Sequence, residues 1–364
     1  MWLVPHLRFP EFTEEWVNVS LKDVADFQKE RISSGLLDES TYISTENILQ
    51  NFQGVQSAIS IPANTNVVAY KKNDILLSNI RPYLKKVWFS DRIGGCSADV
   101  FVLRSKTCEP EFLYNVIASD KFINYVMSGA KGVKMPRGDK NQMESFSFSI
   151  PAVVEQRKIS RLFQLLDERI VTQNKIIDKL QSLIKGIRNN AMAKIEGDSI
   201  TLEDIADIYQ PQTIASTDLT EDGYLVYGAN GVIGKYHLYN HDKEQICITC
   251  RGNTCGTVNF TAPKSWITGN AMVINTDNFA QNVNKRYLFH YLSSINFNSI
   301  ISGSGQPQIV RQPLVKLKLI LPALTIQNHI TECLDAMLAK INNEQSFLQA
   351  LQKQKIYLLS QMLI

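Results

Sequence analysis

Two loops in the first half of the chain combine cations with groups that can read nucleic acid. Residues 78–86 (SNIRPYLKK) mix three cations with an amide and an aromatic side chain, and residues 131–140 (KGVKMPRGDK) form a basic loop interrupted by glycine. Residues 302–311 (SGSGQPQIVR) hold the corresponding place in the second half. Arg can bond guanine bidentately, Asn and Gln can do the same for adenine, and Lys holds phosphate as a point charge. The different polar chemistry of the loops in the two halves therefore predicts contacts with two different half-sites of a nucleic acid.

Two other stretches have the composition of known sites but not their geometry. Residues 228–236 (GANGVIGKY) have a G-x5-G-K spacing in place of G-x4-G-K, and Tyr236 stands where a phosphate loop needs Ser or Thr for magnesium. Cys247 and Cys250 with nearby His237 and His241 suggest zinc, but residues three apart on a strand face opposite sides. We therefore interpret the glycines as turns and expect buried cysteines.

No catalytic set can be recognised in the chain. The five histidines are dispersed, and there is no Ser-His-Asp or Cys-His arrangement, no Asn-Pro-Pro-Tyr motif for amino methylation and no Pro-Asp with Glu-x-Lys of a metal nuclease. A binding role is therefore favoured over catalysis, with no catalytic residue, no metal site and no cofactor predicted in this chain.

Composition and charge limit the kind of partner. At 364 residues and 44% hydrophobic content the chain is expected to fold into about two domains of ~150 residues. The net charge is only +3, but residues 1–50 carry −5 and residues 51–150 carry +5, and residues 201–222 and 223–322 repeat this polarity with −6 and +6. A shared polarity in both halves predicts that each presents a basic face to a polyanion, although chance placement of solvated charges is the alternative.

Cysteine usage and hydropathy predict a cytoplasmic protein. Six scattered cysteines have neither the density nor the spacing of a disulfide framework. The first ten residues lack a basic region followed by an apolar stretch, and no run approaches the ~20 apolar residues that span a bilayer. We expect the chain to be neither exported nor embedded in a membrane.

The chain is a duplication. Residues 21–26 (LKDVAD) return as residues 202–207 (LEDIAD), 181 positions later, and residues 149–159 return as residues 320–330, 171 positions later. The two halves therefore follow one plan and differ by about ten residues of insertion or deletion.

Each half ends in a long amphipathic segment that follows a proline, Pro151 or Pro322. The spacing of four and three predicts helices of about 40 residues that bury one seam against each other, whereas isolated core helices are the alternative. The predicted seam positions, of which seven and then six are apolar, are Leu166, Ile170, Gln173, Ile177, Leu180, Ile184, Ile187 and Ala191, and Met337, Ile341, Glu344, Leu348, Leu351, Lys355, Leu358 and Met362.

The remainder of each half reads as mixed α/β. Alternation predicts strands at residues 74–78, 100–103 and 245–250, and apolar faces predict helices over residues 111–127 and 285–301. The fold class predicted is α/β, with two globular lobes joined by two long helices in a pseudo-twofold internal repeat.

The chain resembles, over nearly its whole length, the specificity subunits of type I restriction-modification systems. The resemblance rests on residues 7–12 (LRFPEF) with Glu15 and Trp16, on the repeated LKDVA stretch, and on residues 155–159 (EQRKI) at the helix entry. It also rests on residues 227–234 (YGANGVIG), 249–252 (TCRG) and 268–271 (TGNA). The second helix entry, residues 326–329 (IQNH), lacks the Glu, which puts a fixed role for that acidic residue in doubt.

The resemblance implies a non-catalytic subunit that reads a bipartite target in double-stranded DNA. Its lobes would be target recognition domains at 1–152 and 196–322, and its spacer helices, at 153–195 and 323–364, would form an antiparallel coiled coil. The partners implied are two modification subunits that bind S-adenosylmethionine and methylate adenine, and restriction subunits that translocate and cut DNA with ATP and magnesium.

A rigid spacer predicts half-sites about one helical turn apart, ~34 Å, so that both lobes engage one face of the duplex. The alternative is a coiled-coil scaffold that binds protein without sequence-specific DNA recognition, and a self-contained methyltransferase-nuclease is disfavoured by the missing motifs. The residues predicted to contact DNA are Arg81, Lys85, Lys86, Lys131, Lys134, Arg137 and Lys140 in the first lobe and Lys235, Tyr236, Arg251, Asn253, Gln306, Gln308 and Arg311 in the second.

Overall fold

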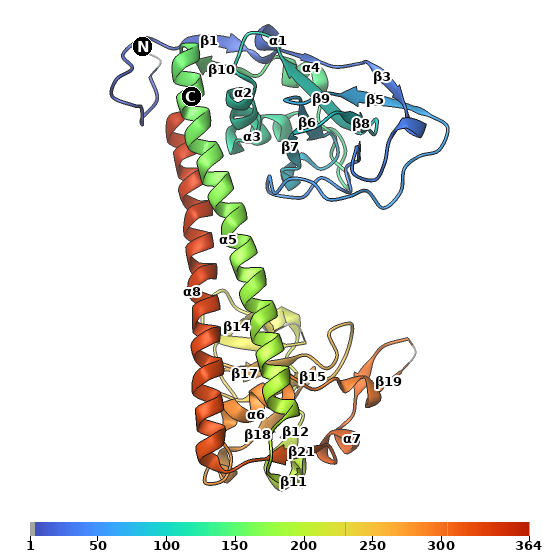
Figure 1. Ribbon diagram of the computed structural model, residues 1–364, viewed down its shortest axis with the longest axis vertical. Helices are drawn as coiled ribbons and strands as arrows, with labels where there is room; N and C mark the ends of the chain where they lie inside the picture. Colours follow the sequence, from blue (N-terminus) through green and yellow to red (C-terminus); the bar gives the residue numbers. More distant parts are fainter. Residues whose placement is uncertain (1–3, 230, 304, 364) are drawn as a thin grey trace. The chain divides into compact units, whose positions relative to one another are not determined.

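The computed structural model describes residues 4–229, 231–303 and 305–363. It divides into two compact units, one made of Met1–Asn174 with Ser346–Ile364 and the other of Lys175–Gln345. Two long helices, α5 (Val153–Ala193) and α8 (Leu324–Met362), each contribute one part to each unit (Figure 1). We call the part of unit 1 that precedes α5 lobe 1, and the part of unit 2 between α5 and α8 lobe 2.

Lobe 1 contains ten strands and four short α-helices among its described residues. The strands are β1 (Val17–Ser20), β2 (Ala25–Phe27), β3 (Arg31–Ser33), β4 (Tyr42–Ile43), β5 (Asn66–Tyr70), β6 (Ile75–Ser78), β7 (Val87–Phe89), β8 (Gly94–Cys96), β9 (Val100–Ser105) and β10 (Ser147–Ile150). The helices are α1 (Leu21–Val24), α2 (Pro110–Ile117), α3 (Asp120–Ser128) and α4 (Lys140–Glu144), with 3-10 turns η1 (Ser34–Leu36) and η2 (Pro82–Leu84).

Lobe 2 repeats this order with changes. Its strands are β11 (Asp198–Thr201), β12 (Asp207–Tyr209), β13 (Tyr224–Gly228), β14 (Gly231–Tyr236), β15 (Ile246–Thr249), β16 (Val258–Phe260), β17 (Trp266–Ile267), β18 (Ala271–Asn275), β19 (Ile301–Ser302), β20 (Gln308–Ile309) and β21 (Lys318–Leu321). Its helices are α6 (Lys285–Leu292) and α7 (Arg311–Val315), with 3-10 turns η3 (Leu202–Asp204), η4 (Ser216–Asp218), η5 (Asp277–Phe279) and η6 (Phe297–Ser299).

The sheet register confirms the duplication to the residue. Strand β1 pairs with β10 with Val17 opposite Ile150, and β11 pairs with β21 with Asp198 opposite Leu321. These partners are related by the two sequence offsets, 181 and 171. The central sheets, ordered β2-β9-β6-β7 and β12-β18-β15-β16, are antiparallel and obey the same offsets, because Phe27–Leu103 becomes Ile208–Ile274.

The central sheet of each lobe lies between two apolar clusters. The strand predicted at 74–78 is β6, and it is buried on both faces, because Ile75 and Leu77 face the main core of lobe 1 while Leu76 faces a second cluster. In lobe 2, Cys250 lies in the core with Ile246 and Ile248, and Cys247 lies in the cluster on the other face. Both thiols are buried, as predicted, and burial raises the pKa of Cys247 to about 12.

Two predicted helices are shorter than the apolar pattern suggested. The stretch 111–127 forms α2 and α3 because Ser119 caps the second helix, with its hydroxyl accepting from the Phe122 amide at 3.2 Å. The stretch 285–301 stops at Leu292, and a separate 3-10 turn at Phe297–Ser299 is capped by Asn296. Side-chain caps of this kind accept hydrogen bonds from the first amides of a helix or turn, so they mark the start of a new element even where apolar residues continue the period.

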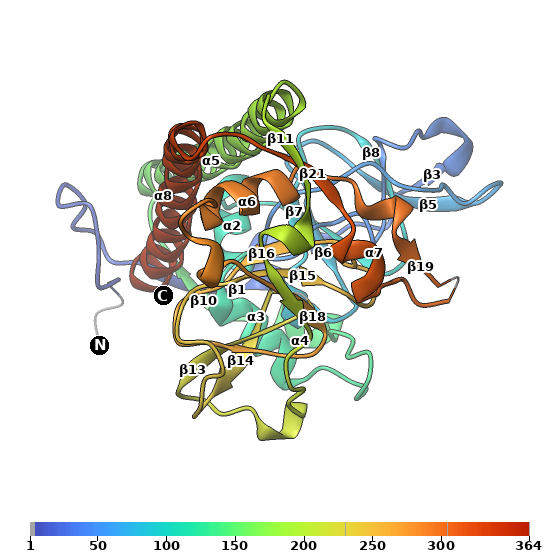
Figure 2. The ribbon, with the colours of Figure 1, turned by 90° about the horizontal axis from the view of Figure 1, so that it is seen from below.

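Helices α5 and α8 pack side by side and antiparallel within each unit (Figures 1 and 2). In unit 2, Ile184 and Met192 of α5 meet Leu334 and Ile341 of α8. All eight predicted seam positions of α8 and seven of α5 are buried or half-buried, which confirms the coiled-coil prediction. Ile187 is the exception at 37% exposed.

The polar seam position Lys355 has a specific partner. Its Nζ lies 2.5 Å from Asp167 Oδ1 on the facing helix of unit 1. The equivalent seam position of α5 is Ile184, which is buried among apolar residues. A buried ammonium is tolerated in a helix seam where a carboxylate compensates it.

Candidate nucleic-acid interface

In lobe 1 the backbone joins the two predicted loops directly. Loop 79–86 connects β6 to β7, and loop 129–139 connects α3 to α4. The Arg81 amide donates to the Pro136 carbonyl at 2.8 Å, and the Gly138 amide donates to the Asn79 carbonyl at 3.1 Å. Residues 131–137 are closed on themselves by a second pair of bonds between Lys131 and Arg137. Two loops about 50 residues apart in the sequence are therefore held side by side by backbone hydrogen bonds.

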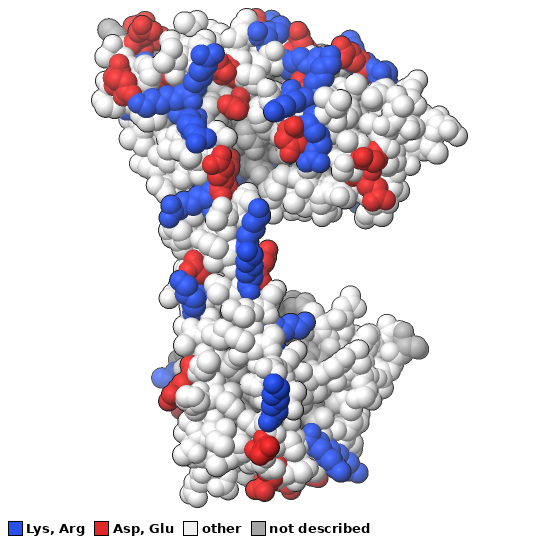
Figure 3. Space-filling model, in the orientation of Figure 1, with Lys and Arg blue, Asp and Glu red and all other residues white. Residues whose placement is uncertain are grey.

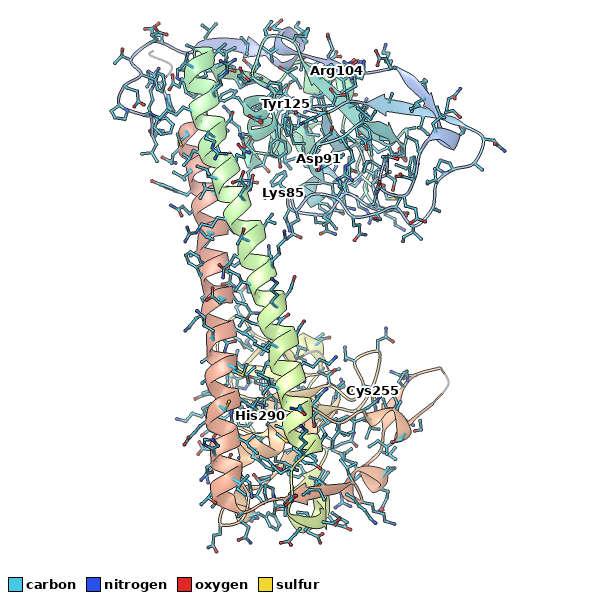
Figure 4. All side chains as sticks on the ribbon, in the orientation of Figure 1. Lys85, Asp91, Arg104, Tyr125, Cys255 and His290 are labelled. Carbon is cyan, nitrogen blue, oxygen red and sulfur yellow. The ribbon has the colours of Figure 1, made fainter. Side chains whose placement is uncertain are left out.

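Lobe 2 builds the same junction from other residues. The Gly252 amide donates to the Pro307 carbonyl and the Ile309 amide donates to the Cys250 carbonyl, both at 3.0 Å. The Lys131–Arg137 pair is matched by β19 and β20, where Ser302 lies opposite Gln308. Every one of these positions is 171 residues beyond its counterpart in lobe 1. In Figure 4, the label Lys85 marks the loop between β6 and β7, and the label Cys255 marks the equivalent loop between β15 and β16.

The predicted cations of lobe 1 differ in whether they have a hydrogen-bond or ion-pair partner within the lobe. Lys85 pairs with Asp120 at 2.6 Å, Lys131 with Asp139 at 3.1 Å, Arg137 with Asp99 at 3.0 Å and Lys140 with Glu144 at 3.3 Å. The ammonium of Lys86 donates to the Thr45 carbonyl, and burial lowers its pKa. Among the described residues, the side chains of Arg81 and Lys134 make no hydrogen bond or ion pair.

In lobe 2 the predicted residues fall into two groups. Arg251, Asn253, Gln306 and Gln308 are exposed on the joined loops, with Arg251 bridging to Gln308. Lys235 and Tyr236 lie instead on the β13–β14 hairpin, where Lys235 is 3.8 Å from Asp222 and Tyr236 meets Trp266 edge to face.

Arg311 and its counterpart Lys140 are partly committed to the fold. Arg311 Nε donates to the Ile208 carbonyl at 2.7 Å, and Lys140 Nζ lies 5.1 Å from the ring centre of Phe27. Ile208 and Phe27 are equivalent residues of the central sheets. Each cation therefore anchors the start of its short helix, α7 or α4, to the neighbouring strand.

Charge on these surfaces is unequal between the lobes. In the view of Figure 3, Lys and Arg side chains gather in clusters on lobe 1 with Asp and Glu among them, whereas lobe 2 shows few charges of either sign. The pKa of Asp139 is lowered, mainly because its carboxylate accepts a hydrogen bond from the Gln142 amide at the start of α4. The hydrogen bond from the Lys131 side chain lowers it further. Acidic partners therefore lie beside four of the lobe 1 cations, Lys85, Lys131, Arg137 and Lys140.

An aromatic side chain was visible in the sequence of loop 79–86 but is not among the residues predicted to contact DNA. This residue, Tyr83, is 49% exposed between Arg81 and Lys85. The acidic partners Asp99 and Asp120 come from other segments and had no sequence signal. The position of Tyr83 among cations was the signal available for the aromatic group.

The stretches that resemble a phosphate loop and a zinc site have structural roles. Gly228 and Gly231 lie at the β13–β14 turn, where Gly231 has φ +80°; Asn230 between them and Ser304 of the second loop lie outside the described residues. His241 Nε2 is 2.9 Å from the Tyr209 hydroxyl and its Nδ1 is 2.6 Å from Asn240. No group of His, Cys, Asp or Glu that could hold a metal ion occurs within the described parts of the chain.

None of the helices in the described ranges combines the length and the hydropathy that a membrane span requires.

Comparison with known proteins places the chain in a family. A family profile described as "Type I restriction modification DNA specificity domain" matches residues 13–182 and 195–353. The chain is 29% identical to the type I restriction enzyme EcoprrI specificity subunit of Escherichia coli over 147 residues, which are 39% of this chain and 36% of that subunit. It is 21% identical to the MjaVIII specificity subunit of Methanocaldococcus jannaschii over 91% of this chain and 87% of that one. The first match thus spans about a third of its relative's length.

Solved structures show the same fold. The type I restriction-modification S subunit from M. genitalium superimposes with a TM-score of 0.64 at 14% identity, covering 99% of both chains. A structure from a study of complex assembly in a type I system gives 0.58 at 18% identity, covering 94% of this chain and 96% of the other. Two matched segments, one per half, fit the duplication seen in the register. The chain therefore belongs to the family of type I restriction-modification DNA specificity domains.

Proposed function

We propose that this chain is the non-catalytic, sequence-reading subunit of a type I restriction-modification complex, with one lobe for each half of a split DNA target. The observation that carries the proposal is the joined loop pair, built twice on one backbone register with different exposed side chains. A common frame with different polar groups suits two readers of different base sequences.

The coiled coil supports a bipartite target. Continuous helices α5 and α8 run through both units and share a buried seam in each. A stiff connection holds two readers at one separation, so half-sites near one helical turn apart, ~34 Å, are favoured. Tethering also makes the second half-site contact intramolecular, which multiplies selectivity.

Exposed apolar side chains on the helices support protein partners. Val154, Leu165 and Val171 of α5 and Ile356 and Tyr357 of α8 are 46–66% exposed in unit 1. Apolar surface of this kind is covered in stable complexes. We assign it to two modification subunits, which would bring S-adenosylmethionine and adenine methylation, with restriction subunits that use ATP and magnesium completing a cytoplasmic complex.

The test is a methylome map of the source cells with and without this gene. Loss of adenine methylation at one split motif is the expected result and reads out both half-sites together. No change, even after co-expression with the modification subunits, overturns the proposal and leaves the protein-binding scaffold as the function to test.

A further inference from the structure

The two lobes share one strained turn but fill it with different residues. In loop 79–86, Arg81 and Lys85 have left-handed backbones, with φ +51° and +53°. Their counterparts 171 positions later are Gly252 and Gly256, with φ +86° and +90°. The turn thus needs two left-handed residues in both lobes, and lobe 2 uses the residue type that adopts this conformation without a steric cost.

Lobe 1 keeps a side chain at each position although glycine would relieve the backbone. A left-handed non-glycine residue persists where something else requires the side chain, and such residues gather at functional sites. The junction fixes the turn from both sides, because the Arg81 amide donates to Pro136 and its carbonyl accepts from the Leu84 amide at 2.9 Å.

Lys85 has a partner within the lobe. Its Nζ lies 2.6 Å from Asp120 Oδ1 at the first residue of α3, so its side chain ties the turn to that helix. Arg81 has none. Its guanidinium is exposed and, among the described residues, makes no hydrogen bond, ion pair or ring contact.

The chemistry of the position favours a base over a phosphate. A phosphate contact needs only a positive charge, which the flexible Lys134 of the adjoining loop can supply without backbone strain. A rigid turn that fixes the direction of a planar guanidinium is useful where two parallel hydrogen bonds must reach two acceptors at fixed positions. Guanine offers such a pair in the major groove, O6 and N7.

Resting on the proposed function, we propose that Arg81 is a specificity-determining residue that reads a guanine in the half-site of lobe 1. Gly252 leaves the same place empty in lobe 2, so reading there falls to the neighbouring exposed groups Arg251, Asn253 and Gln308. The left-handed backbone is therefore the same in both lobes, and the base that each lobe recognises depends on whether this position carries the Arg81 side chain or, as at Gly252, none.

The experiment uses the full chain co-expressed with its modification subunits and a randomised duplex DNA library, from which bound sequences are selected and read. Arg81→Gly copies the lobe 2 residue and removes the strain, so it is expected to leave the Tm unchanged or raise it by about 2–4 °C. Discrimination for guanine at one position of one half-site is expected to fall by about 10–100-fold, with the other half-site unchanged.

Lys264→Gly is the matched control. Lys264 is an exposed left-handed cation, φ +49°, in the turn between β16 and β17, outside the predicted interface. It should give a similar Tm effect and an unaltered motif. A uniform loss of affinity in Arg81→Gly would show a phosphate contact, and an unaltered motif would show no contact; either result overturns the inference. If the unmodified complex selects no split motif, the proposed function itself fails.

Discussion

The two lobes differ least where their strands pair and most where their surfaces face outward. The central sheets and the β1–β10 and β11–β21 pairs keep one register under fixed offsets. The second sheets do not. Lobe 1 has the order β3-β5-β8-β4, whereas lobe 2 has β14-β13-β17, and the place of β5 is reduced to a single bridge between His241 and Ser265.

The length difference lies within this outer region. The offset between equivalent residues is 181 at Phe27 and 171 at Ile75, so the ten residues are lost between β2 and β6. Insertions and deletions are tolerated in peripheral segments, because the central ladder and its two cores do not depend on them. The halves therefore share one frame of paired strands, on which the outer segments and their exposed side chains differ.

The helix entries also differ. In unit 1, Glu155 is 1% exposed and receives two 2.8 Å hydrogen bonds from Arg8. The equivalent residue in unit 2 is Ile326, which is 47% exposed. The ion pair therefore stabilises unit 1 alone, where the segment that bears Arg8 also bonds the end of α8 through the Leu7 amide and the Gln361 carbonyl.

The largest expected effect tests that asymmetry. Arg8→Ala leaves the buried Glu155 carboxylate without its partner and should lower the free energy of unfolding of unit 1 by about 3 kcal/mol. Hydrogen exchange resolved by unit, across a urea series, measures it. Arg157→Ala is the control, because the Arg157–Glu109 pair is mostly exposed on its Arg side at 69% and should cost less than about 1 kcal/mol. Equal costs would show that the entry does not depend on the buried pair.

The next effect should be alike in both units. Gln156 accepts from the Glu109 amide at 2.9 Å and donates to the Pro151 carbonyl at 2.8 Å, and Gln327 does the same with Asn284 and Pro322. Removing either side chain by Gln→Ala leaves buried backbone groups unpaired and should cost about 2 kcal/mol in its own unit. Exposed Gln164→Ala should be neutral within about 0.5 kcal/mol. Costs that differ threefold between the units would contradict a shared helix entry.

Acid should destabilise unit 2 more than unit 1. Burial lowers the pKa of His241 and of His290, and all histidines except His6 lie in unit 2. The unfolded chain takes up protons below pH ~6.5 while these folded imidazoles stay neutral, so stability is lost as the pH falls through 6.5. Between pH 7.5 and 5.5 each should remove up to about 1.4 kcal/mol from unit 2.

Urea unfolding at the two pH values measures the acid effect. His290→Asn, which places in α6 the residue that α2 has at Asn115, should remove part of the pH dependence, and exposed His329→Gln should not. Asp335 does not titrate in this range. Burial acts to raise its pKa, but the hydrogen bonds from Arg286 and His290 outweigh burial and lower it, so its contribution to the stability of unit 2 is lost only in stronger acid. An equal pH slope in both units would argue against the buried histidines as the cause.

The smallest effect concerns the seam. Lys355→Met gives α8 the apolar character that α5 has at Ile184, and exchanging a paired buried charge for an apolar side chain should change the free energy of unfolding by less than about 1 kcal/mol. Asp167→Ala leaves the ammonium 11% exposed and unpaired and should cost more, about 1–2 kcal/mol. Denaturant unfolding compares the two, and a costlier Lys355→Met would show that the pair stabilises the seam.

Several features of the candidate site were predictable from the sequence. The repeated loops and their basic or amide character are visible in residues 131–140 and 302–311. The matching of Arg81 and Lys85 with glycines could also have been found by extending the 171-residue offset. The pairing of loop 79–86 with loop 129–139 could not, because no local pattern specifies which distant loop a carbonyl will meet.

The sequence by itself determined the duplication, the two long helices and their seams, since hydrophobic period and repeat offsets are properties of the chain alone. Tertiary structure decided the rest. Both faces of β6 became buried, each predicted helix was divided into two elements of which the second begins at a cap, Ser119 or Asn296, and Asp167 became the partner of Lys355 in the seam. These outcomes depend on which remote groups come within hydrogen-bonding or packing distance, and only the folded chain sets those distances.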